Sequence, residues 1–122
     1  MRIIKSGIRL NKVVLDIVTS HSFLVITLAG NLIILGCSYI FYLLEYGINS
    51  SIHTFLDAVW WAFATATTVG YGDIIPVTAA GKVLGILLML MGTALFAMYT
   101  ALFAQSIMED EMLRLGKKSK RP

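Results

Sequence analysis

The chain has 122 residues, of which 57% are hydrophobic and only 14% are charged, and its formal net charge is +3 at pH 7. With a mean hydropathy of +0.80, the chain carries too little charge to cover its apolar surface in water, which argues against a soluble fold. This length allows one small domain at most, and we expect that domain to lie in a lipid bilayer.

The N-terminal segment, residues 1–22, mixes basic and aliphatic residues at near-helical spacing. Such a segment either lies as a basic amphipathic helix in the headgroup plane or is a frayed tail whose positive charge sets the topology. Arginine does not recur every third residue through a span, so the sequence contains no voltage-sensing helix.

The first long apolar run covers residues 23–44 and contains no Lys, Arg, Asp or Glu. At about 1.5 Å per residue, a helix over this run is about 33 Å long, which is enough for a hydrocarbon core of about 30 Å. Small residues in the run, such as Gly30 and Ser38, would let another helix approach. The basic start followed by ILGC also resembles a lipoprotein signal cleaved before Cys37, but the apolar run continues past the cysteine, which favours a span.

A shorter apolar segment, residues 55–66, is too short to cross the bilayer, and we expect it to be a re-entrant helix. Thr54 and Asp57 have the spacing of a capping box at its start. The stretch TATTVGYGD that follows, residues 65–73, would then lie at membrane depth. A non-helical backbone is tolerated there only if it packs within protein or lines a watery cavity.

Glycine occurs at alternate positions of this stretch, Gly70 and Gly72. For successive carbonyls of an extended segment to face one side, residues must alternate between right- and left-handed dihedrals, and left-handed positions favour glycine. A row of such carbonyls suits a cation, as does the negative C-terminal end of the preceding helix. Since one copy cannot surround an ion, the residues predict a cyclic oligomer with a cation pathway. They do not identify the ion or the number of subunits.

The second span covers residues 81–108 and carries no charge after Lys82. Basic residues precede the first span and follow the second, whereas none lies between Glu45 and Gly81. The positive-inside rule therefore places both termini in the cytoplasm.

The remaining residues, 109–122, would form a cytoplasmic tail that is solvated or disordered. Its acidic residues are either a solvated helix end or a ring that draws cations to the inner mouth: Glu109, Asp110 and Glu111.

The sequence TVGYGD at residues 68–73 resembles the signature of potassium channels. Its surroundings, VWWAFATATTVGYGDIIPVT, are similar to those of two-transmembrane prokaryotic potassium channels of the KcsA type, and residues 23–108 follow that family's order of elements. The resemblance implies an all-α membrane protein with two transmembrane helices, a re-entrant pore helix and a selectivity-filter loop at residues 68–72. It further implies a homotetramer in the plasma membrane that conducts K⁺ passively, without a cofactor.

The resemblance also assigns roles by position. Backbone carbonyls would coordinate K⁺ at four residues, with the hydroxyl of the first forming the innermost ring: Thr68, Val69, Gly70 and Tyr71. Support for the filter would come from Gly72, Asp73, Trp60, Trp61 and Ala64, with the Trp60 indole N–H bonded to Asp73. Because Ala64 stands where the KcsA type carries a glutamate, we expect different filter stability and inactivation.

On the second span, Gly92 lies where family members place a hinge glycine, although a glycine that packs against a neighbouring helix is the alternative. One helical face continues from it, and the resemblance places that face on the cavity and the cytoplasmic gate. Its residues are Thr93, Phe96, Thr100, Ala104 and Met108.

Other functional classes have no support in the sequence. We find no phosphate loop, nucleophile triad or hydrolytic carboxylate pair, and expect neither an enzyme nor a nucleic-acid partner. His21 and His53 lack partners at metal-ligand spacing. The alternatives are a pore domain detached from a longer channel with a cytoplasmic sensor domain, and a non-conducting hairpin that accompanies a larger channel.

Overall fold

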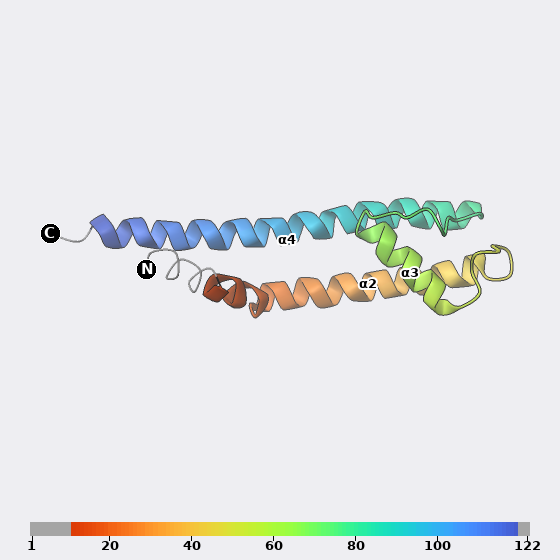
Figure 1. Ribbon diagram of the computed structural model, residues 1–122, viewed down its shortest axis with the longest axis horizontal. Helices are drawn as coiled ribbons and strands as arrows, with labels where there is room; N and C mark the ends of the chain where they lie inside the picture. The colour runs from red at the N-terminus through yellow and green to blue at the C-terminus, as the bar shows by residue number, and fades with distance from the viewer. Residues whose placement is uncertain (1–10, 120–122) are drawn as a thin grey trace. The chain divides into compact units, whose positions relative to one another are not determined.

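The computed structural model describes residues 11–119; residues 1–10 of the N-terminal segment and 120–122 of the tail lie outside the described residues. Three helices are α2 (His21–Glu45), α3 (Phe55–Ala66) and α4 (Ala79–Ser119), as Figure 1 shows, and a short helical segment at 11–18 precedes them. Within residues 11–119 all regular structure is helical. Two helices, α2 and α4, are long and apolar enough to cross a membrane, which confirms the expected all-α class.

The chain divides into two compact units, Thr27–Phe96 and Met1–Ile26 together with Ala97–Pro122. In the first unit, α3 packs between α2 and the first half of α4 (Figure 1). Phe41 of α2 and Trp61 of α3 stack with ring centroids 3.5 Å apart and planes 10° from parallel. The core around this pair consists of Ile34, Cys37, Ile52, Ala58, Ala62, Ala66 and Leu88.

The start of α3 is fixed by the capping box that the sequence predicted. The Thr54 hydroxyl accepts a hydrogen bond from Asp57 N, and the Asp57 carboxylate accepts from Thr54 N at 2.7 Å and His53 N at 2.9 Å. These N–H donors hold the pKa of Asp57 below its ordinary value, because they stabilise the charged carboxylate. The negative charge also suits the positive end of the helix.

A buried carboxylate joins the end of α2 to the start of α4. Glu45, the last residue of α2, is 0% exposed. It accepts from Val77 N and Thr78 N, both at 2.9 Å, and from the Thr78 hydroxyl at 2.7 Å. Asn49 donates to the same carboxylate at 2.7 Å and to the Ile75 carbonyl at 2.8 Å. Four charge-assisted hydrogen bonds compensate for the burial, and they fix the segment that leads out of the loop.

The helix α4 is longer than the predicted 81–108, since it continues to Ser119. Its polar end contains the strong helix formers Glu, Met, Leu, Arg and Lys and no proline, which explains the extension. At about 1.5 Å per residue the 41 residues reach about 62 Å, roughly twice the hydrocarbon core. The last part of α4 therefore projects beyond the apolar part of a bilayer.

In the second unit, the start of α2 packs against the latter half of α4. Phe23 contacts Tyr99 and Phe103, with ring centroids 5.4 and 6.4 Å apart. Ile17 of the preceding helical segment is buried, at 4% exposed. The side of α4 that carries Tyr99 and Phe103 is therefore covered within the chain, whereas other parts of the α4 surface stay exposed.

We predict that Glu45→Ala lowers the melting temperature of the purified protein in detergent. The N–H groups of Val77 and Thr78 would lose a buried acceptor, and each such loss costs about 1–3 kcal/mol. Glu45→Gln keeps one acceptor oxygen, so its melting temperature should lie between those of wild type and Glu45→Ala. Glu109→Ala, which removes an exposed carboxylate, is the control; equal melting of Glu45→Ala and wild type would refute the role of Glu45.

Candidate functional site

The loop after α3 contains three residues in the left-handed region at alternate positions. The angle φ is 63° at Thr68, 52° at Gly70 and 79° at Gly72, and it is negative at Val69 and Tyr71 between them. The alternation expected from the two glycines is present and extends one step further. A β-branched residue with positive φ is a steric outlier, and such strain is typical of functional backbone.

The N–H groups and the carbonyl groups of this loop differ in their hydrogen bonding. Thr68 N donates to Thr65 O at 3.1 Å and Gly70 N donates to Ala64 O at 3.0 Å, so both N–H groups are satisfied by the last turn of α3. Within residues 11–119, no protein group donates a hydrogen bond to the carbonyl oxygens of residues 68–71. Four consecutive carbonyls without a protein partner are available to a cation or to water.

Aromatic packing behind the loop holds its C-terminal end. The expected hydrogen bond from Trp60 Nε1 to the Asp73 carboxylate is present at 2.8 Å. The Trp60 ring also stacks on Tyr71, with centroids 5.3 Å apart and planes 7° from parallel. The neighbouring Trp61 is buried instead in the core, where it stacks on Phe41, and a Cβ added at Gly85 would lie 3.5 Å from its ring. The two tryptophans therefore support different parts of the structure.

The residue Ala64 acts on the loop through its backbone. Its carbonyl accepts the Gly70 N–H, and its side chain is a methyl group that is only partly exposed. The predicted consequence of the missing glutamate, a different filter stability, stays a prediction.

A close backbone contact joins the end of α3 to α4 at Gly92. A Cβ added there would overlap the carbonyl oxygen of Ala66 and would lie 2.7 Å from its Cα and 2.8 Å from its carbonyl carbon. Since these are backbone atoms, they cannot move without displacing the last turn of α3. Gly92 therefore packs closely against another helix, which is the role that the sequence offers as the alternative to a hinge. The hinge role stays a prediction.

The predicted cavity face of α4 is exposed in the single chain at each of its five positions. Thr93 bonds its hydroxyl back to the Met89 and Leu90 carbonyls, at 3.1 and 2.9 Å, and so presents an oxygen on the helix surface. The assignment of this face to a cavity or a gate stays a prediction. The residues are Thr93, Phe96, Thr100, Ala104 and Met108.

Two contributions to the site were not foreseen from the sequence. In the sequence, Glu45 only marks the end of the first apolar run. A carboxylate at the end of such a run needs a hydrogen-bond partner when it is buried, and that need could have predicted its role. The left-handed Thr68 gave no signal, because threonine disfavours that conformation. In the described part of the chain, no cluster of His, Cys, Asp and Glu could hold a metal ion.

Comparison with known proteins relates this geometry to one family. The profile of a family described as ion channel matches residues 23–109. A voltage-gated potassium channel from Aeropyrum pernix is 53% identical over 62 residues, which are 50% of this chain and 21% of the relative. A calcium-gated potassium channel from Thermoplasma volcanium is 32% identical over 109 residues, 88% of this chain and 31% of the relative. The chain thus spans less than a third of the length of these relatives.

A solved structure has the same fold. It is a voltage-gated K⁺ channel pore module in a closed state in lipid membranes, 34% identical, with a TM-score of 0.62. The match covers 70% of this chain and 90% of that one. A second structure, the pore domain of a voltage-gated K⁺ channel, is 39% identical with a TM-score of 0.54.

We predict that Gly92→Ala destabilises the fold, because the new methyl group would displace the last turn of α3. The measurement is the melting temperature and the yield of folded protein in detergent. Gly116→Ala is the matched control on the same helix, since a Cβ at Gly116 meets nothing within 4 Å. A Gly92→Ala protein that melts like the control would show that the close contact relaxes freely and would leave only the hinge role.

Proposed function

Because this chain belongs to the ion channel family and shares the fold of potassium channel pore modules, we propose that it forms a potassium-selective channel. The resemblance to KcsA-type pores is confirmed at the level of family and fold. The two relatives described above are ion channels by name, which supports a transport role and a membrane location rather than catalysis.

One observation carries the proposal: the carbonyls of residues 68–71 have no partner in the described part of the chain, and the backbone of this loop is left-handed at alternate positions. In a homotetramer with a four-fold axis, this loop from each copy supplies rings of oxygen atoms at Thr68, Val69, Gly70 and Tyr71. Such rings replace the hydration shell of K⁺, and the Thr68 hydroxyl adds the innermost ring. The ion crosses passively, without a cofactor.

The loop must stay open when an ion leaves it. The hydrogen bond from Trp60 to Asp73 and the stacking of Trp60 on Tyr71 hold its outer end from behind. At its inner end, N–H groups of the loop bond to the last carbonyls of α3. The C-terminal end of α3 also carries the negative pole of the helix dipole, which favours a cation in front of it.

Orientation follows from charge. Basic residues gather before α2 and after Glu111, whereas Lys82 is the first basic residue after Lys12. The positive-inside rule supports cytoplasmic termini, with α3 and the loop reached from outside. We assign the chain to the plasma membrane, with lipid and three further copies of itself as partners.

A second candidate is the pore domain of a larger ligand-gated channel. The relative named as calcium-gated matches 88% of this chain with 31% of its own length, and a relative named as cyclic nucleotide-gated, from Rhizobium etli, matches 75% with 26%. A pore of this kind can therefore be coupled to different stimuli. The intact loop argues against the third candidate, a non-conducting accessory hairpin.

We predict K⁺ flux into liposomes that contain the purified protein, and loss of most of that flux in Gly70→Ala. At this position a Cβ meets no atom within 4 Å, but φ is +52°, so the substitution acts through backbone strain, about 1–2 kcal/mol in each subunit. Gly116→Ala is the control and should conduct like wild type. Absence of K⁺ flux in wild-type liposomes, across a range of pH, voltage and Ca²⁺, would reject the channel.

We also predict that Ala64→Glu changes the decay of the current. A glutamate here would place a second carboxyl group behind the loop near Asp73, as in the KcsA type, and so alter the hydrogen bonds that hold the outer end. The decay of the current would be measured in planar bilayers while the activating condition is held constant, with Ala64→Gln as the uncharged control. Equal decay in wild type and Ala64→Glu would contradict the prediction.

A further inference from the structure

A polar side chain near the middle of α2 lies at a depth where lipid offers it no hydrogen bond. Along the helix axis, Asn31 is about 15 Å from His21 and about 21 Å from Glu45, the two ends of α2. In a bilayer with a hydrocarbon core of about 30 Å, this position lies well inside the apolar layer.

Most of the hydrogen-bonding capacity of Asn31 is unused. An asparagine amide offers two N–H donors and one carbonyl acceptor. One N–H donates to the Thr27 carbonyl at 2.8 Å, and within residues 11–119 no protein group pairs with the rest of the amide. Among these residues no buried side-chain polar atom lacks a partner, so the free atoms of Asn31 lie at the surface of the single chain. An unpaired amide in contact with lipid tails is costly.

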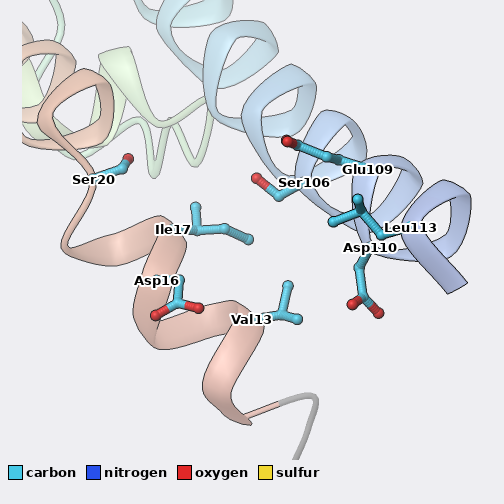
Figure 2. Close-up of a pocket in the computed structure, with 8 residues that line it drawn as sticks. All are labelled: Val13, Asp16, Ile17, Ser20, Ser106, Glu109, Asp110 and Leu113. Carbon is cyan, nitrogen blue, oxygen red and sulfur yellow. The ribbon is translucent and has the colours of Figure 1, made fainter. Parts of the chain in front are cut away.

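Polar side chains near the C-terminal end of α4 are in a different situation. Figure 2 shows Ser106, Glu109 and Asp110 beside the helical segment 11–18, where they line a cavity of about 240 Å³. Ser106 is about 40 Å along α4 from Ala79, which is close to the thickness of a bilayer with its headgroups. Water and headgroups can therefore bond to these side chains, whereas neither reaches the depth of Asn31.

Asn31 belongs to an exposed strip of α2, which we define as Leu28, Asn31 and Leu35. The three residues lie within about 60° of arc on the helix, and Leu28 is 64% and Leu35 41% exposed. A single asparagine among leucines is typical of a surface that packs on another helix, where the amide bonds across the interface and sets the register.

The short helix α3 covers the continuation of this side of α2 but not the strip itself. Tyr39 and Tyr42 contact Phe55 of α3, with ring centroids 6.4 and 6.0 Å apart. At its other end α3 stops at Ala66, whose backbone meets Gly92 of α4. In the described part of the chain no helix continues α3 past that end, so the strip is open to a helix from another chain.

The helix α4 has a suitable surface at the depth of the strip. A Cβ added at Gly30, next to Asn31, would lie 3.0 Å from the Leu95 side chain, so Asn31 and Ala94 are at nearly the same height. Ala94 is exposed and lies about 160° around the helix from Gly92, away from α3. Its small side chain would let another helix approach closely enough for an amide to reach the backbone carbonyls of α4.

We propose that the strip of one copy packs against α4 of the neighbouring copy at Ala94, and that the free N–H of Asn31 donates to a backbone carbonyl of that helix. The occupant is a second copy because lipid has no polar group at this depth. A rotational axis along the membrane normal also keeps every Ala94 at the height of every Asn31. This inference rests on the proposed tetramer and adds a residue that fixes its copies to one another.

The variant Asn31→Leu tests the bond through the direction of its effect. If Asn31 faced lipid, leucine would leave the tetramer unchanged or make it more stable, because it removes an unpaired amide from hydrocarbon. We expect a weaker tetramer instead. One interhelical hydrogen bond in a membrane changes an equilibrium by about threefold, so the loss of four should lower the tetramer-to-monomer equilibrium by about 80-fold.

Native mass spectrometry over a range of protein concentrations measures this equilibrium. Asn31→Gln keeps the amide and should retain most of the tetramer. Gly36→Ala is the control on another side of α2, since a Cβ at Gly36 meets nothing within 4 Å. A tetramer of Asn31→Leu as stable as that of wild type would overturn the inference.

Disulfide cross-linking tests the placement without relying on Asn31→Leu. In the full chain with Cys37→Ala, the pair Asn31→Cys and Ala94→Cys should give covalent dimers after mild oxidation in liposomes, since a disulfide needs Cα atoms within about 7 Å. The pair Gly36→Cys and Ala94→Cys is the matched control and should react at least about tenfold more slowly. Equal rates, or no covalent dimers from the first pair, reject the placement.

The flux of K⁺ into the same liposomes separates this inference from the channel itself. A conducting wild-type tetramer that Asn31→Leu does not weaken rejects the bond and leaves the channel intact. A wild-type protein that is monomeric and does not conduct rejects both.

Discussion

The whole site depends on the four backbone carbonyls of residues 68–71, which have no hydrogen-bond partner within residues 11–119. A polar backbone group at membrane depth is costly unless something satisfies it, so in the proposed channel an ion or water would satisfy these carbonyls. The left-handed residues at 68, 70 and 72 keep these carbonyls available, and the N–H groups of Thr68 and Gly70 bond instead to carbonyls at the end of α3. The strain at Thr68 is tolerated because the surrounding structure holds the loop in place.

Three contacts far apart in sequence supply that support. Glu45 fixes the exit of the loop to the end of α2, Trp60 holds Asp73 and Tyr71, and Gly92 lets α4 approach the backbone of Ala66. Glu45 joins α2 to the segment before α4, Trp60 joins α3 to the loop, and Gly92 joins α4 to the end of α3. The loop is therefore supported at its exit by Glu45 and from α3 by Trp60, and the last turn of α3 is packed against α4 at Gly92.

Local patterns in the sequence predicted the features that depend on local physics. Long uncharged runs gave the two spanning helices, the Thr54–Asp57 pair gave the start of α3, and alternate glycines gave two left-handed positions. Features that depend on distant partners were missed. The bonds of Glu45 reach Val77 and Thr78, more than thirty positions away, and Thr68 adopts a conformation that its residue type disfavours. The extension of α4 was also missed, because the polar composition of residues 109–119 indicates a solvated tail, whereas most of these residues also favour a helix.

The most direct test of the carbonyl site is its choice between K⁺ and Na⁺, because rings of backbone oxygens distinguish the two ions without any charged side chain. The measurement is the reversal potential of purified protein in a planar bilayer, with K⁺ on one side and Na⁺ on the other. We expect a reversal potential far from zero, with the sign that K⁺ permeation sets. A reversal potential near zero in a conducting protein would contradict a potassium-selective filter at Thr68, Val69, Gly70 and Tyr71.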